Sequence, residues 1–270
     1  MMDKKVVLIT GGSSGLGKAI GTYLTSKNFK VYGTARNPKN YQGFDAFELL
    51  PLDVKIPETI TKAVAEVISK EGRLDILINN AGVGITGPIE ETPHEEILNV
   101  FDINFHGPIH VIKAVLPQMR EQGEGKVINI TSIAGYMGLP FRGYYSASKG
   151  ALGVITEALR MEVKDFGISI TNLAPGDFAT NIAAGRYHAP VMDGSPYEAV
   201  YQKSLDLMNE HVDAGGDPIQ VAEKVYAIIQ KQNPKIHNPV GEFMQKFSLF
   251  LKKVLPDKIY ERLLLNHYKL

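Results

Sequence analysis

Short apolar runs alternate with longer segments of helical periodicity along the first two thirds of the chain. The apolar runs are rich in β-branched residues and lie at residues 5–10, 30–34, 47–52, 74–78, 126–131 and 169–173. The spacing between them predicts helices over residues 15–27, 57–70, 94–121 and 144–165. Strands that alternate with helices predict a parallel sheet covered on both faces, the doubly wound α/β or Rossmann fold.

Beyond residue 176 this alternation ends and the pattern becomes mostly helical. We expect helical pieces around residues 197–210, a helix over 218–231, a last strand within 235–240 and two tail helices divided by Pro256. Neither a repeat nor a long linker divides the chain, so we expect a single domain. Its parts are a cofactor and catalytic core at 4–180, a substrate lid at 181–217 and a C-terminal extension at 241–270, together spanning 1–270.

The composition narrows the function classes. Of the 270 residues, 44% are hydrophobic, and basic and acidic residues number 29 each, so no bulk charge favours nucleic acid. The absence of cysteine excludes disulfides and thiolate catalysis. The chain starts without a signal peptide and no apolar run approaches a membrane span, so we expect a cytoplasmic protein. His106 and His110 share a helix face but lack a third ligand, so we expect no metal site.

A glycine-rich loop, TGGSSGLG, joins the first predicted strand to the first helix at residues 10–17. Its glycines permit a sharp turn and a close approach to a bound group, and the helix that follows offers unpaired N–H groups to phosphate. The glycine spacing is one residue wider than the common dinucleotide fingerprint, but the strand before and the helix after indicate nucleotide binding. We expect the cofactor to contact Gly11, Ser13, Ser14, Gly15, Leu16 and Gly17.

The end of the second predicted strand, TARN, bears on which cofactor binds. Arg36 stands where an acidic residue would hold the ribose hydroxyls of NAD, and an arginine suits a 2′-phosphate. Taken alone, Arg36 is equally well a solvated surface arginine, but the missing acid favours NADP(H) over NAD(H). Asp53 and Val54 end the third strand near the expected adenine position. Asp53 is also placed to cap the helix that begins at residue 57, and the two roles are compatible.

The stretch GYYSASKG places a phenol and an ammonium four residues apart, at Tyr145 and Lys149. On a helix both lie on one face. A cation about 4 Å from a phenol, at an effective dielectric near 20, favours the phenolate by roughly 4 kcal/mol. That scale suits a general acid–base. Ser132 ends the fifth strand, where its hydroxyl can orient a substrate carbonyl; of Thr131 and Ser132, only one is expected to face the cleft.

Together these motifs resemble those of the short-chain dehydrogenase/reductase family, in its branch with a single Rossmann domain. TGGSSGLG, NNAG at 79–82, Ser132, Tyr145-x-x-x-Lys149 and PG at 175–176 follow one another in the family's order, and the match covers roughly residues 4–180. The resemblance implies a seven-stranded parallel sheet, a nicotinamide cofactor and a homodimer or homotetramer. It also selects Ser132 over Thr131 as the catalytic residue.

The resemblance further assigns roles to single residues. Asn104 links Lys149 to solvent through water, and Lys149 also contacts the nicotinamide ribose; the alternative for Asn104 is local bonding inside a helix. The remaining cofactor contacts are Asn80, Ala81 and Gly82 beneath the fourth strand, and Pro175, Gly176, Phe178 and Thr180 at the nicotinamide end.

The lid and the tail are where we expect substrate identity to be encoded. Apolar and aromatic residues in the lid suggest a large apolar pocket for a bulky ketone or alcohol, such as a steroid or keto-lipid: Ile182, Tyr187, Val191, Met192, Tyr197, Tyr201, Leu205 and Met208. His188 is a further candidate substrate contact. The tail is amphipathic with several lysines, and some steroid, retinoid and keto-lipid reductases of the family have comparable tails. It either contacts a membrane or packs on its own domain or a dimer partner, and we favour packing.

Two other functions remain open at this point. A non-catalytic NADP(H)-sensing or regulatory protein could keep the same fold, but it has no need to retain Ser132, Tyr145 and Lys149 together. An epimerase or dehydratase usually has a longer substrate domain or a different residue at Ser132. We therefore predict an oxidoreductase that transfers a hydride between NADP(H) and a carbonyl or secondary alcohol.

Overall fold

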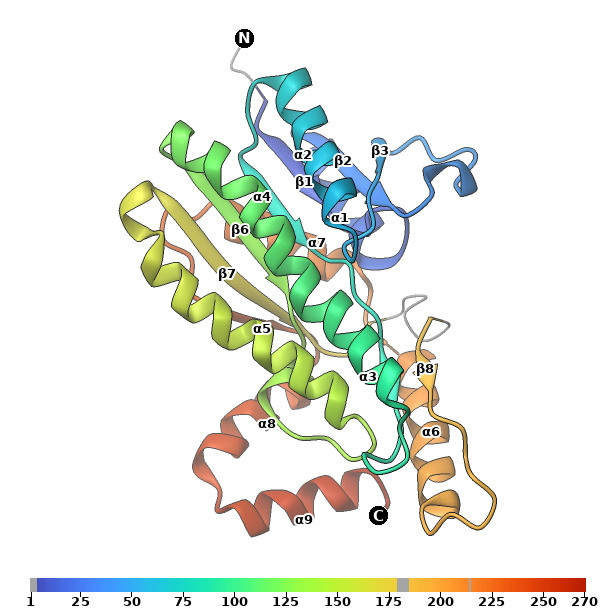
Figure 1. Cartoon of the computed structure of the whole chain (residues 1–270). Helices are drawn as coiled ribbons and strands as arrows, with labels where there is room; N and C mark the ends of the chain where they lie inside the picture. Colours follow the sequence, from blue (N-terminus) through green and yellow to red (C-terminus); the bar gives the residue numbers. More distant parts are fainter. Residues whose placement is uncertain (1–3, 179–184, 214) are drawn as a thin grey trace.

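The computed structural model describes residues 4–178, 185–213 and 215–270, and it is built around one central sheet (Figure 1). Seven parallel strands lie in the order β3-β2-β1-β4-β6-β7-β9. Their bounds are Val6–Ile9 (β1), Lys30–Ala35 (β2), Glu48–Pro51 (β3), Ile76–Asn79 (β4), Gly125–Ile130 (β6), Ile168–Pro175 (β7) and His237–Val240 (β9). The predicted doubly wound α/β fold is confirmed, and KIHNPV supplies the last strand.

Helices cover both faces of this sheet because side chains of the central strands alternate between two cores. Val6 and Leu8 of β1 point into one core, while Val7 and Ile9 point into the other, and all four are buried. In register, Val7 lies opposite Val31 of β2. The first core is covered by α2 (Pro57–Glu71), α4 (Gly107–Gln122) and α5 (Gly143–Glu162), and the second by α1 (Gly15–Ser26) and α7 (Ile219–Ile229).

The segment predicted as one helix over 94–121 contains a wider turn. Helix α3 (His94–Phe101) is followed by a π-helical turn, Asp102–His106, before α4 begins. Such turns are rare and are frequent at functional sites. Here the turn holds the fully buried Asn104. Short 3-10 helices complete the core at Pro38–Asn40, Ile133–Tyr136 and Lys164–Phe166.

A small second sheet connects the lid to the core. Strand β5 (Ile85–Thr86) pairs in parallel with β8 (Tyr187–His188), and α6 (Glu198–Asp213) follows. Tyr201 of α6 is buried and donates a hydrogen bond from its hydroxyl to the Thr86 carbonyl at 3.0 Å. The lid is therefore fixed by a few long-range contacts rather than by the central sheet.

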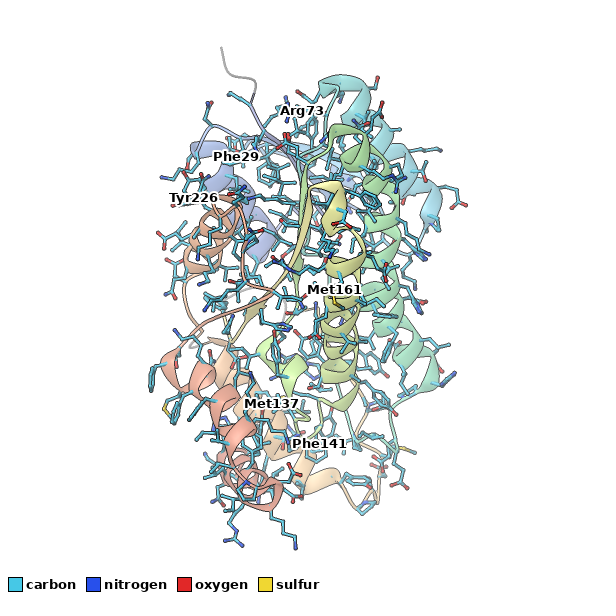
Figure 2. All side chains as sticks on the ribbon, turned by 90° about the vertical axis from the view of Figure 1, so that its left-hand side faces the viewer. Phe29, Arg73, Met137, Phe141, Met161 and Tyr226 are labelled. Atoms are coloured by element: carbon cyan, nitrogen blue, oxygen red, sulfur yellow. The ribbon has the colours of Figure 1, made fainter. Side chains whose placement is uncertain are left out.

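The tail forms the two predicted helices, α8 (Phe243–Val254) and α9 (Asp257–His267). Tyr260 of α9 packs on Ile133 and Met137, which follow β6, so one face of the tail packs on its own chain, as favoured from the sequence. Met137 and Phe141 lie in the lower half of Figure 2, whereas Phe29 and Tyr226 lie in its upper half. The outer face of α8 exposes Phe243 and Phe250. Within the described ranges, no helix has the length and apolar character needed to cross a membrane.

Candidate active site

An open cleft of 810 Å³ follows the carboxyl ends of the central strands. Ligands bind at this edge in doubly wound sheets, where the strand order reverses, and the order here reverses between β1 and β4. The volume lies in the range of small-molecule and cofactor sites. The glycine loop, the ends of β2 and β4 and the start of α5 all contribute to the lining, so the structure brings most of the predicted residues into one place.

The glycine loop has the backbone that its sequence predicts. Gly11 and Gly15 adopt φ values of 64° and 52°, where glycine is favoured. A β-carbon at Gly17 would lie 2.2 Å from the Gly11 carbonyl oxygen, so only glycine lets α1 approach the turn this closely. Gly17 therefore packs behind the loop, whereas Gly11, Ser13, Ser14, Gly15 and Leu16 line the cleft.

The start of α1 is open to an anion. Ser14 is the N-cap residue but its side chain makes no capping hydrogen bond, so the first N–H groups of the helix carry no side-chain partner. Asn80 donates hydrogen bonds to the carbonyl oxygens of Thr10 and Gly11, both at 3.0 Å, and so holds the loop against the end of β4. This cradle fits the phosphate group of a dinucleotide.

The adenosine side of the cleft contains Arg36, Asp53 and Val54, as expected. Arg36 is exposed, and no ion pair engages it within the described part of the chain. Asp53 does not cap α2, whose N-cap residue is Ile56. Its carboxylate instead accepts a hydrogen bond from the Lys55 N–H at 2.9 Å, in a turn before the helix. The capping prediction for Asp53 is wrong because the chain makes one more turn before α2 begins.

Tyr145 and Lys149 lie one turn apart near the start of α5 and both line the cleft, together with Ser132. The Lys149 ammonium is buried and donates a hydrogen bond to the Ile130 carbonyl at 3.0 Å. Burial lowers the pKa of Lys149 to about 8, because the charged form loses water. The neighbouring Tyr144 donates its hydroxyl to the Ile89 carbonyl instead. The start of α5 therefore presents one phenol and one amine to the cleft.

Both residues at the end of β6 reach the cleft, although only one was expected to do so. The Thr131 hydroxyl donates to the Leu173 carbonyl at 3.2 Å. The Ser132 hydroxyl accepts the Ala134 N–H at 3.2 Å and makes a long contact of 3.4 Å with the Pro175 carbonyl. The chain turns into a 3-10 helix directly after Ser132, which ends the strict alternation of side chains.

Asn104 lies behind the cleft rather than in its lining. Its amide oxygen accepts the Val83 N–H, and its amide nitrogen donates to the Val83 carbonyl and to the Ser148 hydroxyl. These bonds join the π-helical turn to α5 and to the loop after β4, so local bonding inside one helix is excluded. A β-carbon at Gly82 would lie 3.1 Å from the Asn104 oxygen and 3.2 Å from the Lys149 amine. Gly82 thus lets both groups approach the cleft wall.

The predicted nicotinamide end is described for Pro175, Gly176 and Phe178, which line the cleft together with Asn80, Ala81 and Gly82. Thr180 and Ile182 lie outside the described residues. A residue that the sequence did not single out, Gln245 of α8, donates its amide to the Asp177 carboxylate at 3.0 Å. The tail therefore supports the turn that follows β7.

The lid contributes less apolar surface to the cleft than the sequence suggested. Leu207 and Met208 pack on Tyr268 of the tail. His188 bonds the Thr86 hydroxyl at 2.9 Å, and burial is the main cause that lowers its pKa. Instead, the described lid residues that line the cleft are Gly185 and Arg186, with Arg142 beside them. Neither arginine belongs to a motif, so no sequence signal indicated them.

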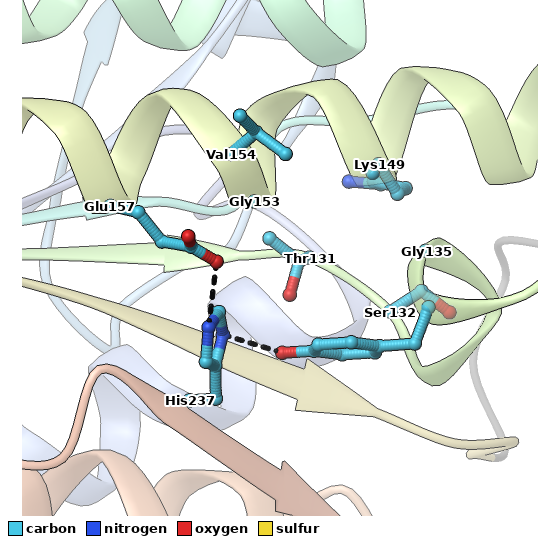
Figure 3. Close-up of a pocket in the computed structure, with 10 residues that line it drawn as sticks. Thr131, Ser132, Gly135, Lys149, Gly153, Val154, Glu157 and His237 are labelled. Atoms are coloured by element: carbon cyan, nitrogen blue, oxygen red, sulfur yellow. Dashed lines mark hydrogen bonds and ion pairs between the residues drawn. The ribbon is translucent and has the colours of Figure 1, made fainter. Parts of the chain in front are cut away.

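A separate cavity of 80 Å³ has Thr131, Ser132 and Lys149 in its wall (Figure 3). A chain of hydrogen bonds borders it: the Tyr136 hydroxyl lies 2.9 Å from Nδ1 of His237, whose Nε2 lies 2.9 Å from the Glu157 carboxylate. Burial, with a smaller contribution from Glu157, raises the pKa of Tyr136 to about 12, so its phenol stays protonated. Among the residues that the structure describes, no cluster of three histidine or acidic side chains could hold a metal ion.

Known relatives and solved structures agree with this geometry. The chain is 37% identical over 261 residues to a 3-ketodihydrosphingosine reductase of Bacteroides thetaiotaomicron, with 96% of each sequence covered. A short-chain dehydrogenase structure from Streptomyces avermitilis superposes with a TM-score of 0.84 at 31% identity, covering 100% of this chain and 97% of that one.

Structures with bound cofactor are also similar. ElxO with NADP superposes with a TM-score of 0.70 at 26% identity, covering 88% of this chain and 97% of that one. A short-chain dehydrogenase/reductase from Burkholderia phymatum with NAD gives a TM-score of 0.75 at 25% identity, covering 87% and 89%. A family model described as short chain dehydrogenase matches residues 5–190. The chain belongs to the short-chain dehydrogenase/reductase family of oxidoreductases.

Proposed function

We propose that this oxidoreductase is an NADP(H)-dependent carbonyl reductase whose substrate is a ketone on a lipid-like chain, with oxidation of the secondary alcohol as the reverse reaction. The observation that carries the proposal is one cleft that holds the glycine loop and Arg36 together with Ser132, Tyr145 and Lys149. A nucleotide site and a complete acid–base set thus share one lining. When bound, the nicotinamide would supply the hydride.

Side chains of the protein act on the carbonyl oxygen of the ketone. The Tyr145 phenol donates the proton that the carbonyl oxygen needs as it becomes an alcohol. The Ser132 hydroxyl donates only a long 3.4 Å hydrogen bond to the Pro175 carbonyl, so its proton can turn to the same oxygen. Because each group acts on the charge that develops at this oxygen, both contribute to the rate rather than to binding alone.

Lys149 supports Tyr145 through its charge. Since burial brings the pKa of Lys149 to about 8, the amine is still a cation at neutral pH, but it loses its proton in mildly alkaline solution. Asn104 is a positioning residue, because it ties α5 to the loop after β4 through Ser148 and Val83. In this proposal it keeps the start of α5 in place against the cleft.

Arg36 supports NADP(H) as the cofactor. Its guanidinium is exposed at the adenosine side of the cleft, where a 2′-phosphate would accept paired hydrogen bonds. The relative that reduces 3-ketodihydrosphingosine supports a lipid ketone as the substrate. A steroid is the other bulky ketone that we proposed, and a cofactor-sensing protein without turnover is the alternative from a different class.

The test is a panel assay with the purified chain. NADPH oxidation is followed with long-chain ketones, steroids, quinones and small polar ketones, and NADH is run in parallel. We expect turnover of long-chain ketones with a clear preference for NADPH. A preference for NADH would refute the role of Arg36. The change in NADPH fluorescence on mixing with the chain reports binding; binding without turnover of any ketone would favour the sensing protein.

A further inference from the structure

Two arginines stand beside the catalytic phenol. Arg142 directly precedes α5, and its guanidinium carbon lies 5.3 Å from the centre of the Tyr145 ring. Arg186, which precedes β8, runs along the loop after β4, where a β-carbon at Gly84 would lie 2.9 Å from its Cγ. Both side chains line the cleft. The cleft therefore carries two positive charges where the reacting group of a substrate would lie.

The described residues offset these charges only in part. The Nη1 atom of Arg186 is buried and has no hydrogen-bond partner among the described residues. No carboxylate within those residues forms an ion pair with Arg142 or Arg186. The nearby Asp177 accepts the Gln245 amide at 3.0 Å, and its charge offsets only part of that of Arg186. Buried polar groups are nearly always hydrogen-bonded, so an orphaned guanidinium nitrogen indicates a missing partner.

The electrostatics agree with this geometry. Burial lowers the pKa of Arg186, the neighbouring Arg142 lowers it further, and Tyr145 and Asp177 offset only part of this effect. Two like charges held together in a partly dry site stay unfavourable until a further anion joins them. Arginine is the side chain best suited to bind carboxylate or phosphate through paired hydrogen bonds.

The backbone holds both arginines in place. Phe141, next to Arg142, has a φ of 56°, which is strained for an aromatic residue. Its carbonyl accepts the Gly87 N–H at 2.9 Å, and the centre of its ring lies 5.2 Å from the centre of the Tyr201 ring. Contacts with both the core and the lid therefore hold Phe141 in this conformation. On the other side, the Tyr187 N–H donates to the Gly84 carbonyl at 3.0 Å, beside Arg186. Strained residues of this kind gather at functional sites.

The cofactor's ribose phosphate does not account for this pair. Arg36 follows β2, whereas Arg142 belongs to the segment between β6 and α5, and β1 and β4 separate these two strands in the sheet. The open N-terminus of α1 follows β1. The arginine pair is thus a separate positive site, on the side of the cleft that holds Ser132 and Tyr145.

We propose that Arg142 and Arg186 bind an oxyanion of the substrate, a carboxylate or a phosphate monoester carried on its acyl chain, and so place the ketone against Tyr145. The inference rests on the proposed reductase function and sharpens it: the substrate is an anionic keto-lipid rather than a neutral or cationic one. The apolar part of such a ligand contacts Val83, Ile85 and Phe178 in the same cleft.

The test compares long-chain ketones whose head groups differ in charge. A hexadecanoic acid with a γ-ketone, its methyl ester and a long-chain α-amino ketone are each assayed with NADPH in the wild type, Arg186→Met and Arg142→Met. We expect kcat/KM for the acid to exceed that for the ester by about 10- to 100-fold in the wild type, and this ratio to fall toward one in either variant. Arg120→Met is the matched control, because Arg120 also lies over an aromatic ring, 5.7 Å from the centre of Phe166, away from the cleft.

A binding readout separates this inference from the reductase proposal. Palmitate and hexadecyl phosphate, which have no ketone, are titrated into the wild type and Arg186→Met by calorimetry in the presence of NADP. Tighter binding to the wild type supports the anion site even if no ketone is turned over, and the better of the two ligands identifies carboxylate or phosphate as the partner. Equal binding to both proteins, or an amino ketone or ester that is reduced as well as the acid, would overturn the proposal.

Discussion

The two sides of the cleft are built in different ways. The side that holds the glycine loop is made by the central sheet: Gly11 and Asn80 follow adjacent strands, and the Asn80 side chain donates a hydrogen bond to the Gly11 carbonyl. The side that holds Arg142 and Arg186 depends on a pair of two-residue strands, on α6 and on the tail, which are joined by a short backbone ladder and by side-chain packing. In the proposed function, the central sheet therefore presents the cofactor, while a separately assembled edge selects the substrate.

The largest effect is expected where the two sides meet, at Tyr145. Tyr145→Phe removes the proton donor but keeps the ring that packs with Ile85 and Val100. We expect kcat for ketone reduction to fall by about 10²- to 10⁴-fold. NADPH fluorescence should show that the cofactor still binds. A loss of less than about threefold in kcat would remove Tyr145 from the chemistry.

The second prediction concerns the buried amine. Because the pKa of Lys149 falls from 10.5 unfolded to about 8 folded, the unfolded chain binds more protons between these values, and stability rises with pH across that window. The full shift corresponds to roughly 3 kcal/mol. Lys149→Met lacks this titration, so its free energy of unfolding relative to the wild type should decrease by about that amount from pH 8 to 10.5.

Urea denaturation at several pH values measures this difference. A gap between Lys149→Met and the wild type that does not change with pH would show that Lys149 keeps its ordinary pKa. In activity assays, kcat of the wild type should fall above about pH 8, because Lys149 then loses the charge that supports Tyr145.

A third, smaller effect probes the cofactor side. In Gly17→Ala the new β-carbon would lie 2.2 Å from the Gly11 oxygen, so the backbone must move. We expect a loss of about 1–3 kcal/mol in stability together with weaker NADPH binding. Gly138→Ala is the control, since no atom lies within 4 Å of its β-carbon position. Equal effects in the two variants would mean that the glycine loop does not depend on this close approach.

The smallest effect is expected at Arg36, which is exposed. Arg36→Ser should reduce the preference for NADPH over NADH, measured as the ratio of kcat/KM values, by about tenfold, because one charge-assisted contact to phosphate is lost. Lys39→Ser, a charge change on the nearby 3-10 helix, should leave the ratio as it is. An unchanged ratio in Arg36→Ser would separate Arg36 from cofactor choice.

The sequence predicted the strands and the glycine loop well and the contacts of the lid poorly, for physical reasons. Buried parallel strands are continuous apolar runs, so each predicted strand lies within two residues of its observed bounds, as for residues 30–34 and Lys30–Ala35. The glycine loop and Tyr145-x-x-x-Lys149 are local patterns, and their spacing along the chain sets their geometry.

The substrate side depends on contacts between residues far apart in the chain. Thr86 and His188 are 102 positions apart, and two-residue strands carry no periodicity. Arg142 and Arg186 lie close together only when the lid is packed on the core. The hydrophobic pattern of the lid predicts that its apolar residues are buried, but not which part of the protein they pack against. Met208, expected in the pocket, packs on the tail instead. The π-helical turn at Asn104 was missed because its residues also suit an ordinary α-helix.

The central claim is that this cleft transfers a hydride to a ketone. It is tested most directly with NADPH that carries deuterium at the transferable position of the nicotinamide, incubated with the chain and the long-chain keto acid, and with mass spectrometry of the product. We expect an alcohol with one deuterium on the former carbonyl carbon, formed by the wild type and lost in Tyr145→Phe. NADPH that binds but leaves no deuterium in any alcohol product would contradict hydride transfer in this cleft.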